Sequence, residues 1–246
     1  MKHTLIRSAL AAAIAGTFAT SALASTGFYV FGEYSRSDMS SSQAEAYAAE
    51  DIQDLRDTTQ LLNEVFPNTD LNYTPTYRSD ETSNEFGFGV GYRAHANLAL
   101  ELAYRDLGTT SYDTRSTMAG TFNGLPSLSE GGKGTSFESS AIILRAVGIL
   151  PVTEALSLEG LLGVAYVDTD YTAYEFMNSD IGGVYTERYT ASDKGFSATY
   201  GVGASYQITP QVGAFARWER IHDVDTDDIW DGIKADTFSG GIRYHF

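Results

Sequence analysis

The sequence predicts an all-β fold, an eight-stranded antiparallel transmembrane β-barrel with short periplasmic turns and long extracellular loops. Three observations support this fold class. Apolar residues recur with a period of two in eight segments, the connections between the segments alternate between short and long, and aromatic residues gather near the segment ends. An even number of alternating segments joined in this way is typical of barrels in the bacterial outer membrane.

Each of the eight segments alternates between two faces, one mainly apolar and the other carrying most of the small and polar residues together with some apolar ones such as Tyr29, Phe31 and Ile143. The clearest is FGFGVGYR at 86–93, where four large apolar residues alternate with three glycines and Arg93. Glycine is unfavourable in an ordinary strand, so its regular use predicts a second face that lines a narrow, crowded interior. The eight segments are 28–34, 86–93, 98–105, 142–150, 157–166, 196–206, 212–219 and 238–246.

The connections distinguish the two ends of the barrel, because three are short and four are long. We expect the short connections to be periplasmic turns and the long ones to be extracellular loops. The short connections are 94–97, 151–154 and 208–211, and the long ones are approximately 37–83, 108–136, 169–194 and 223–236.

The first long loop contains a helical pattern. Ser42-Gln-Ala-Glu45 resembles a capping box, and Pro67 with Asn68 ends the pattern. We therefore expect an amphipathic helix of several turns outside the membrane, and a partly ordered acidic loop is the alternative. The apolar positions at helical spacing are Ala48, Ile52, Leu55, Leu62 and Phe66, with Thr59 filling one place.

The aromatic residues distinguish a membrane barrel from a secreted soluble barrel or sandwich. In a soluble barrel the apolar face would point inward, whereas an outer-membrane barrel points it at lipid and carries an aromatic girdle at each membrane interface. The sequence predicts both girdles. The loop-side girdle comprises Tyr34, Phe86, Tyr104, Tyr166, Phe196 and Trp218, and the turn-side girdle comprises Tyr92, Tyr206, Tyr244 and Phe246.

The first 24 residues have the pattern of a secretory signal peptide. Lys2 and Arg7 precede a short apolar run over 10–18, and Ala22-Leu-Ala24 fits a cleavage site. We expect cleavage after Ala24, with residues 25–246 forming one outer-membrane β-barrel domain. A spanning helix needs about 20 apolar residues, which neither this run nor any later stretch reaches, so a retained anchor helix is not expected.

The charge and cysteine content exclude several classes of function. The chain has 16 Lys and Arg against 32 Asp and Glu, a net charge of −16 that becomes −18 when the leader with its two basic residues is removed. This sign argues against nucleic-acid binding. The absence of Cys excludes disulfides, thiol catalysis and thiolate metal sites. We expect a monomer without a cofactor, in contact with outer-membrane lipids, lipopolysaccharide and an unknown extracellular partner.

Six charged residues on the polar faces are predicted to point into the lumen. The interior of an eight-stranded barrel is just wide enough for its own side chains. Isolated buried charge is costly, so we expect a paired network. The network either fills the lumen structurally or forms a narrow, gated path for ions. The six residues are Glu101, Arg105, Arg145, Glu159, Arg217 and Glu219.

Two stretches, LALELAYRDLG at 98–108 and SFESSAIILRAVGILPVTEALSLEGLLGVAYVDTD at 136–170, resemble the transmembrane domain of outer membrane protein A and its small-barrel relatives. GIRYHF at the C-terminus resembles the aromatic ending that the barrel-assembly machinery recognises in such families. The resemblance implies that Ile242, Tyr244 and Phe246 are both lipid-facing surface and assembly signal. The chain stops at the barrel, without the periplasmic peptidoglycan-binding domain of outer membrane protein A, so a cell-wall tether is not implied.

Enzymatic chemistry has little support in the sequence. Some small outer-membrane barrels are lipid A deacylases or acyltransferases with Ser and His at the membrane edge. After leader removal, His95 lies in a short turn, His245 is predicted to point inward, and only His222 lies near the outer rim, where we expect it to be a loop residue. No nucleophile motif accompanies it, so we expect no catalytic residue.

The acidic run at 223–228 begins like a calcium-binding loop but does not continue like one. Asp228 stands where the pattern needs Gly, and Lys234 stands where it needs a bidentate Glu. We expect a solvated loop, and weak divalent binding over 223–231 near lipopolysaccharide stays open.

Together these features predict a non-enzymatic outer-membrane barrel that serves envelope structure or surface interaction through its extracellular loops. A small, porin-like gated pore for ions or small solutes is the alternative.

Overall fold

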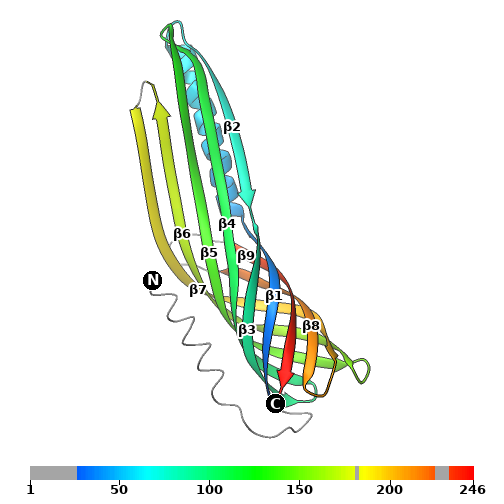
Figure 1. Cartoon of the computed structure of the whole chain (residues 1–246). Coiled ribbons are helices and arrows are strands. Elements are labelled where there is room, and N and C mark those ends of the chain that lie inside the picture. The colour runs from blue at the N-terminus through cyan, green and yellow to red at the C-terminus, as the bar shows by residue number, and fades with distance from the viewer. Residues whose placement is uncertain (1–26, 181–182, 225–232) are drawn as a thin grey trace.

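The computed structural model describes residues 27–180, 183–224 and 233–246, which form an antiparallel barrel that continues into a long extension (Figure 1). The predicted leader and most of the acidic stretch at 223–231 lie outside these residues. Within the described ranges, no helix has both the length and the apolar character needed to cross a membrane. The elements are β1 (Gly27–Ser41), α2 (Ser42–Val65), β2 (Asp70–Asp80), β3 (Thr82–His95), β4 (Leu98–Phe122), β5 (Leu125–Pro151), β6 (Leu156–Ser179), β7 (Gly183–Gln207), β8 (Val212–Val224) and β9 (Ile233–His245).

Eight of the strands close the barrel and confirm the predicted fold class. Their ring order is β1-β3-β4-β5-β6-β7-β8-β9, and β9 pairs back onto β1 over Tyr29–Ser41. Every pairing is antiparallel. Within the ring each strand has a partner on both sides, as lipid requires, because the hydrocarbon core offers nothing to an unpaired backbone group.

Side chains alternate between the two faces of the barrel wall as predicted. On β4 and β5, Leu100 and Leu144 point outward and are 50% and 59% exposed, while Ala99 and Ile143 point inward and are fully buried. Aromatic rings also pair on the outer face near both ends. Tyr34 lies against Phe86 with a centroid distance of 5.1 Å on the loop side, and Phe28 lies against Tyr92 at 4.9 Å on the turn side. The outer surface is therefore an apolar belt bordered by aromatic residues.

Glycines on the inner face make room for large side chains from neighbouring strands. A Cβ at Gly89 would lie 2.5 Å from Cζ of Phe31 and 2.6 Å from the Leu102 carbonyl oxygen. A Cβ at Gly203 would lie 2.6 Å from Cγ of Arg217. Such contacts are too short for real atoms, so any larger residue would displace the neighbour. The glycines predicted to line a crowded interior do so.

The connections at 108–136 and 169–194, predicted as loops, are instead mostly strand. β4 and β5 remain paired from Leu98 to Phe122, and β6 and β7 remain paired along almost their whole length. The tip of the first hairpin is Asn123-Gly124, and both residues have left-handed φ values, 51° and 81°. An Asn-Gly pair is a strong signal for a two-residue hairpin turn, and it is present in the sequence.

A β-bulge at Leu107 changes which residues face inward. Asp106 pairs with Ser140 and Gly108 with Ser139, so Leu107 is an extra residue, and Gly108 has a left-handed φ of 81°. A bulge of this kind bends the strand and shifts its alternation by one position. Beyond it the buried residues of β4 are even-numbered, namely Thr110, Tyr112 and Thr114.

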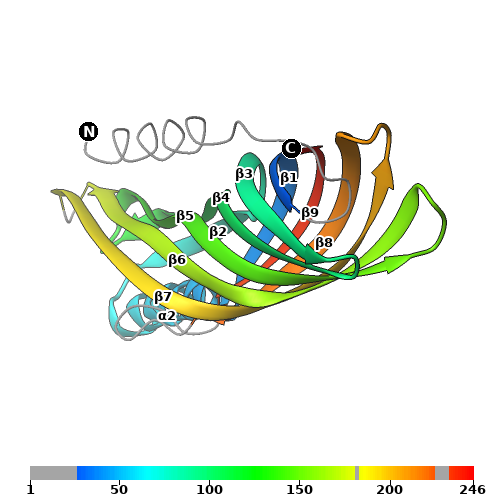
Figure 2. The ribbon, with the colours of Figure 1, turned by 90° about the horizontal axis from the view of Figure 1, so that it is seen from below.

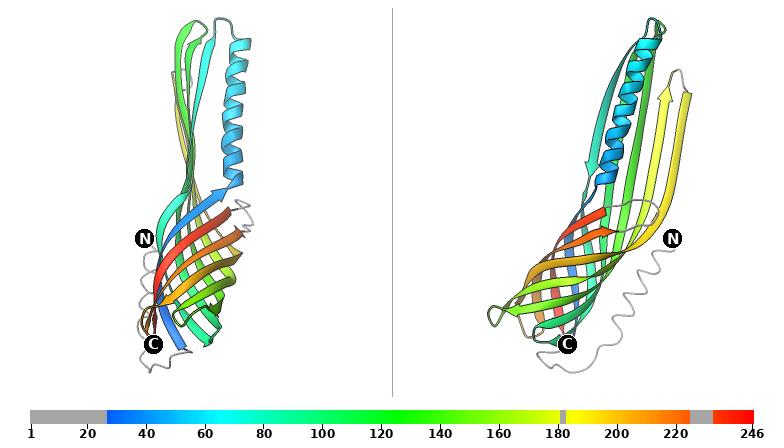
Figure 3. Two further views of the ribbon diagram at one scale, coloured as in Figure 1. Left: turned by 90° about the vertical axis from the view of Figure 1, so that its right-hand side faces the viewer. Right: turned by 180° about the vertical axis from the view of Figure 1, so that it is seen from behind.

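The first long connection contains the predicted helix, together with an additional strand that the sequence analysis did not identify. α2 runs alongside the extended strands (Figure 3). Its buried Thr59 donates a hydrogen bond to the Leu55 carbonyl and lies 3.4 Å from the Met118 sulfur on β4. Asn63 exchanges two hydrogen bonds with Leu71 at the start of β2. α2 therefore covers the lumen-side face of the sheet formed by β2 and β4.

We call the part beyond the barrel the blade and define it as residues 42–80, 111–136 and the described residues of 171–191. Its sheet has the order β2-β4-β5-β6-β7, and it leans to one side of the barrel (Figure 2). One row of aromatic rings crosses its lumen-side face just above the barrel. Successive centroids are 5.3–6.4 Å apart along Tyr112, Phe137, Tyr171 and Tyr189.

Candidate functional site: the charged lumen

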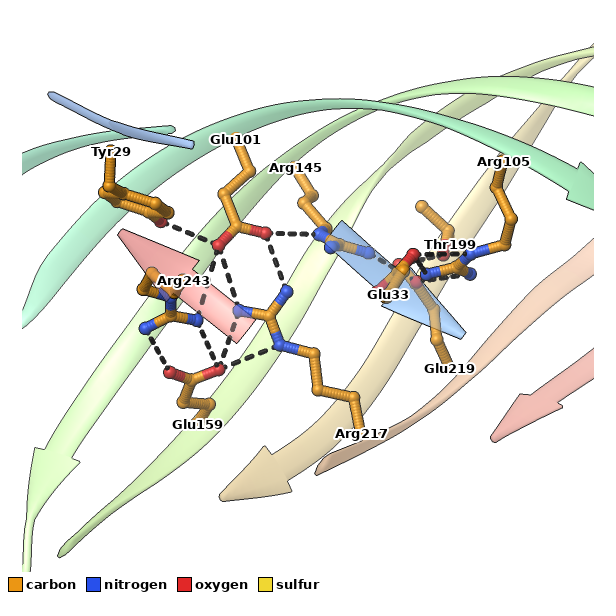
Figure 4. A network of polar contacts seen from close by, with 10 residues as sticks. All are labelled: Tyr29, Glu33, Glu101, Arg105, Arg145, Glu159, Thr199, Arg217, Glu219 and Arg243. Carbon is orange, nitrogen blue, oxygen red and sulfur yellow. Dashed lines mark hydrogen bonds and ion pairs between the residues drawn. The ribbon is translucent and has the colours of Figure 1, made fainter. Parts of the chain in front are cut away.

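Eight charged side chains meet inside the barrel, four arginines and four glutamates (Figure 4). Each stands on a strand at a position whose neighbours along the chain face outward, so the strand alternation alone directs it inward. None is more than 7% exposed. The residues are Glu33 on β1, Glu101 and Arg105 on β4, Arg145 on β5, Glu159 on β6, Arg217 and Glu219 on β8, and Arg243 on β9.

The part of the network nearest the short turns is centred on Arg217. Its guanidinium donates to both carboxylate oxygens of Glu101 at 2.8 and 2.9 Å, and to Glu159 at 2.7 and 2.9 Å. Arg243 donates to Glu159 at 3.0 Å and lies 3.7 Å from Glu101. The hydroxyl of Tyr29 donates to Glu101 at 2.6 Å. Two arginines and two glutamates thus form one closed group.

The part nearest the long loops is built on Arg105. Its guanidinium donates to Glu33 at 2.6 and 2.9 Å. Its Nη1 also forms an ion pair with Glu219 Oε2 at 2.8 Å. Thr199 donates to the other oxygen of Glu219 at 2.9 Å.

Arg145 joins the two parts of the network. Its Nε donates to Glu101 at 2.8 Å, and its Nη1 donates to Glu219 at 2.5 Å. Four arginines and four glutamates make up the network, so the formal charge of the eight residues sums to zero. This balance is what makes so much buried charge tolerable, since each uncompensated ion in the interior would cost several kcal/mol.

Aromatic rings fill the space between the charges on the turn side. The guanidinium carbon of Arg217 lies 4.5 Å from the ring centroid of Phe215. That of Arg243 lies 5.3 Å from the same ring and 5.0 Å from the ring of Tyr29. Contacts of this type stabilise a desolvated cation.

The structure places all six charged residues named from the sequence in this network. Two further members, Glu33 and Arg243, were not named as part of it, although the same alternation puts them on inward faces. Sequence alternation indicates which way a side chain points but not which charges meet. That depends on the stagger of the strands, which brings Arg217 against Glu101, 116 residues away.

The histidines and the assembly residues lie apart from the charged network. His95 ends β3, His245 points inward with its ring 5.1 Å from that of Tyr29, and His222 is exposed. The expectation that His222 lies in a loop is wrong, because it lies within β8, where its carbonyl accepts a hydrogen bond from Ser197. Ile242 and Tyr244 face outward on β9. The described ranges contain no cluster of three or more His, Cys, Asp or Glu able to hold a metal ion.

Comparison with known proteins identifies the family. A model of the OmpA-like transmembrane domain matches residues 57–246, from the middle of α2 to the end of β9. The chain belongs to the OmpA-like transmembrane domain family. In this family the short turns are periplasmic and the long connections extracellular, so the blade stands outside the cell. No curated protein matches the sequence.

Several solved structures are similar to this chain at low sequence identity. Neisserial surface protein A, from Neisseria, is 15% identical, with 89% of this chain and 97% of that chain covered and a TM-score of 0.49. Ail of Yersinia pestis is 15% identical, with 89% and 99% covered and a TM-score of 0.42. The N-terminal β-barrel domain of OprF from Pseudomonas aeruginosa is 11% identical, with 89% and 99% covered and a TM-score of 0.37.

Removing the charge of Arg217 should destabilise the barrel. Arg217→Met keeps most of the bulk but withdraws the donors from Glu101 and Glu159, and breaking a buried pair in this way costs about 3–5 kcal/mol. Urea unfolding of the refolded protein in micelles measures the loss. Arg220→Met is the control, because Arg220 faces outward, is 36% exposed and pairs with Asp236, and an exposed pair contributes about 0–1 kcal/mol. Equal midpoints for the two variants would contradict the role of the network.

Proposed function

We propose that this OmpA-like protein is a non-enzymatic outer-membrane barrel that contributes to envelope structure and contacts other surfaces through its blade. The observation that carries the proposal is the extent of ordered structure beyond the barrel. A barrel needed only as a membrane component has no use for a five-stranded extracellular sheet covered by a 24-residue helix. The apolar belt would contact the lipids, with lipopolysaccharide around the loop end.

The charge of the blade supports a basic partner surface. α2 carries six acidic residues and a single basic one, Arg56. Glu175 and Glu187 stand directly opposite each other on β6 and β7, and like charges in this position repel. The nearby Lys133 is shared, because its Nζ lies 2.5 Å from Asp51 and 4.0 Å from Glu175. Burial lowers the pKa of Lys133, but Asp51 and Glu175 outweigh it and the pKa is raised, so the lysine stays charged.

Removing the blade tests the proposal. In a barrel-only variant, short Asn-Gly turns replace residues 42–80, 111–136 and 171–191. Two of the turns join paired residues, Thr110 with Phe137 and Asp170 with Ser192, and the third links β1 to β3 close to their last pair, Asp38 with Thr82. Cells displaying the full chain should bind beads coated with a basic protein better than cells displaying this variant. The difference should shrink as salt rises, because exposed charges are screened over about 10 Å at 0.1 M.

Two controls make the comparison interpretable. Both forms must reach the surface in equal amounts and show the mobility shift on boiling that is typical of folded barrels. Detergent sensitivity of the cells reports separately on envelope structure, which the barrel-only variant should restore. Equal bead binding by the two forms would refute a role of the blade in surface contact.

We further propose that Ile242, Tyr244 and Phe246 act as an assembly signal and that cleavage after Ala24 precedes assembly. Phe246→Ala should lower the amount of folded barrel in cells while refolding in detergent stays normal. Phe238→Ala is the matched control, because Phe238 is an exposed aromatic residue on the same strand but outside the signal. Equal surface levels of the two variants would contradict the assembly signal. Cleavage is checked by the intact mass of the protein from the outer membrane, and a mass that includes residues before Ser25 would contradict it.

A gated pore is the second candidate function. It is favoured by lumen carboxylates that each contact more than one arginine. Glu101 contacts Arg145, Arg217 and Arg243, and Glu219 contacts Arg105 and Arg145. A carboxylate that contacts several arginines can break one ion pair and keep another, so it is never an unpaired buried charge. If the network is a gate, Arg217→Met should raise the conductance of refolded protein in planar bilayers. Absence of conductance in both wild type and variant would leave the network as a structural plug.

A further inference from the structure

An open groove of about 560 Å³ lies on the lumen-side face of the blade, between α2 and β7. α2 packs against β2 and β4, which leaves this face of β6 and β7 accessible, and Tyr189 on β7 is 60% exposed. Tyr47 on α2 forms one wall of the groove. The strands supply the floor and the other wall, chiefly through Lys133, Tyr171, Glu175, Glu187 and Tyr189.

Tyrosine rings and carboxylates lie together in this groove. The rings of Tyr171 and Tyr189 meet edge to face, with centroids 6.1 Å apart. Glu187 stands two residues before Tyr189 on the same face of β7 and directly opposite Glu175 on β6. A cation is attracted both by the face of an aromatic ring and by a carboxylate. The groove therefore has the chemistry that recognises a positively charged side chain.

The charge around the groove is negative even when its lysine is counted. The Nζ of Lys133 lies 2.5 Å from Asp51 and 4.0 Å from Glu175, so this cation is already shared between two carboxylates. In the part of the chain that the structure describes, Glu187 forms no ion pair with a lysine or arginine, and it accepts a hydrogen bond from the Tyr185 hydroxyl. Three carboxylates against one lysine favour a basic occupant.

β7 is also an open edge of the sheet. It borders the blade on one side (Figure 1), and among the described strands β8 pairs with it only from Thr199 toward the short turns. From Gly183 to Ala191 its described strand partner is β6 alone. The backbone groups along such an edge can pair with an added strand. The opposite edge of the blade, β2, contains Pro75, and proline hinders strand addition.

We propose that an extended, basic segment of a partner protein adds to the edge of β7 and places an arginine side chain beside Glu187 and over Tyr189. In this mode of recognition, main-chain hydrogen bonds supply affinity and alternate side chains supply specificity. The inference rests on the proposed role of the blade in contacting basic surfaces, and it names the strand and the side chains that make the contact.

The spacing of a β-sheet suits this contact. A residue directly opposite Glu187 on an added antiparallel strand would have its Cβ about 4.5–5.5 Å away, and Tyr189 would be its diagonal neighbour at about 7–8 Å. An arginine side chain spans both distances. Its planar guanidinium can stack on a ring and also donate hydrogen bonds to a carboxylate. The added cation would offset the repulsion between Glu175 and Glu187, which stand opposite each other.

The test measures peptide binding to the full chain refolded in micelles of a non-ionic detergent. The probe is a fluorescent peptide in which arginine alternates with threonine, so that every arginine lies on one face of an added strand. A first control peptide has citrulline in place of arginine, which removes the charge and keeps the shape. A second control peptide carries methyl groups on its backbone nitrogens, which keeps the charge and prevents strand pairing. By fluorescence anisotropy at low salt, we expect saturable binding of the arginine peptide and of neither control.

Two matched double variants decide whether the groove beside β7 is the site. Glu187→Gln combined with Tyr189→Leu removes the carboxylate and the ring, and should weaken peptide binding by about tenfold. Glu130→Gln combined with Tyr77→Leu makes the same two changes at exposed residues elsewhere on the blade, and should bind the peptide as the wild type does. All four side chains are exposed, so both variants should fold, which the boiling-dependent mobility verifies.

Any of three results would overturn the proposal. These are the lack of saturable binding by the wild type, equal binding of the arginine peptide and either control peptide, and equal binding by the two double variants. The comparison of bead binding with and without the blade is independent of all three. If cells still need the blade to bind basic beads, the proposed function stands and only the edge of β7 is excluded as the point of contact.

Discussion

The closed network of paired charges in the lumen is the constraint on which the barrel depends. An eight-stranded wall leaves space for side chains but not for a water column, so whatever points inward must fill the volume and cancel its own charge. The arginines take up the space, and glycines such as Gly203 yield it on the facing strands. The glycines and the large charged side chains are therefore complementary in volume, and together they fill the lumen.

The same strands meet two different environments, and their outward residues change accordingly. On β5, Ile142 and Leu144 face outward within the belt, whereas Glu130 occupies an outward position in the blade. The backbone pairing continues across this boundary without a break. The end of the membrane region is thus set by side-chain chemistry, while the β-sheet itself simply extends for as long as partner strands are available.

The sequence was informative where a short-range pattern carries the information. Period-two alternation indicated the eight barrel strands, the lipid face and six inward charges, and helical spacing indicated α2. The prediction from sequence was wrong where a local signal was not used or where no local signal exists. Asn123-Gly124 marks the tip of a hairpin, although 108–136 was predicted as a loop. Leu107 carries no comparable signal, although its bulge reverses the facing of the rest of β4.

By itself, the sequence determined the direction of each side chain in the barrel wall, because direction depends only on the position of a residue within its own strand. It also determined that the inward charges had to balance. Tertiary structure alone decided which charges meet, because contacts such as Arg145 with Glu219 depend on the stagger of strands far apart in the chain. It also decided which strand ends lie together, since closure of the barrel brings the ends of β3 and β9 to either side of β1.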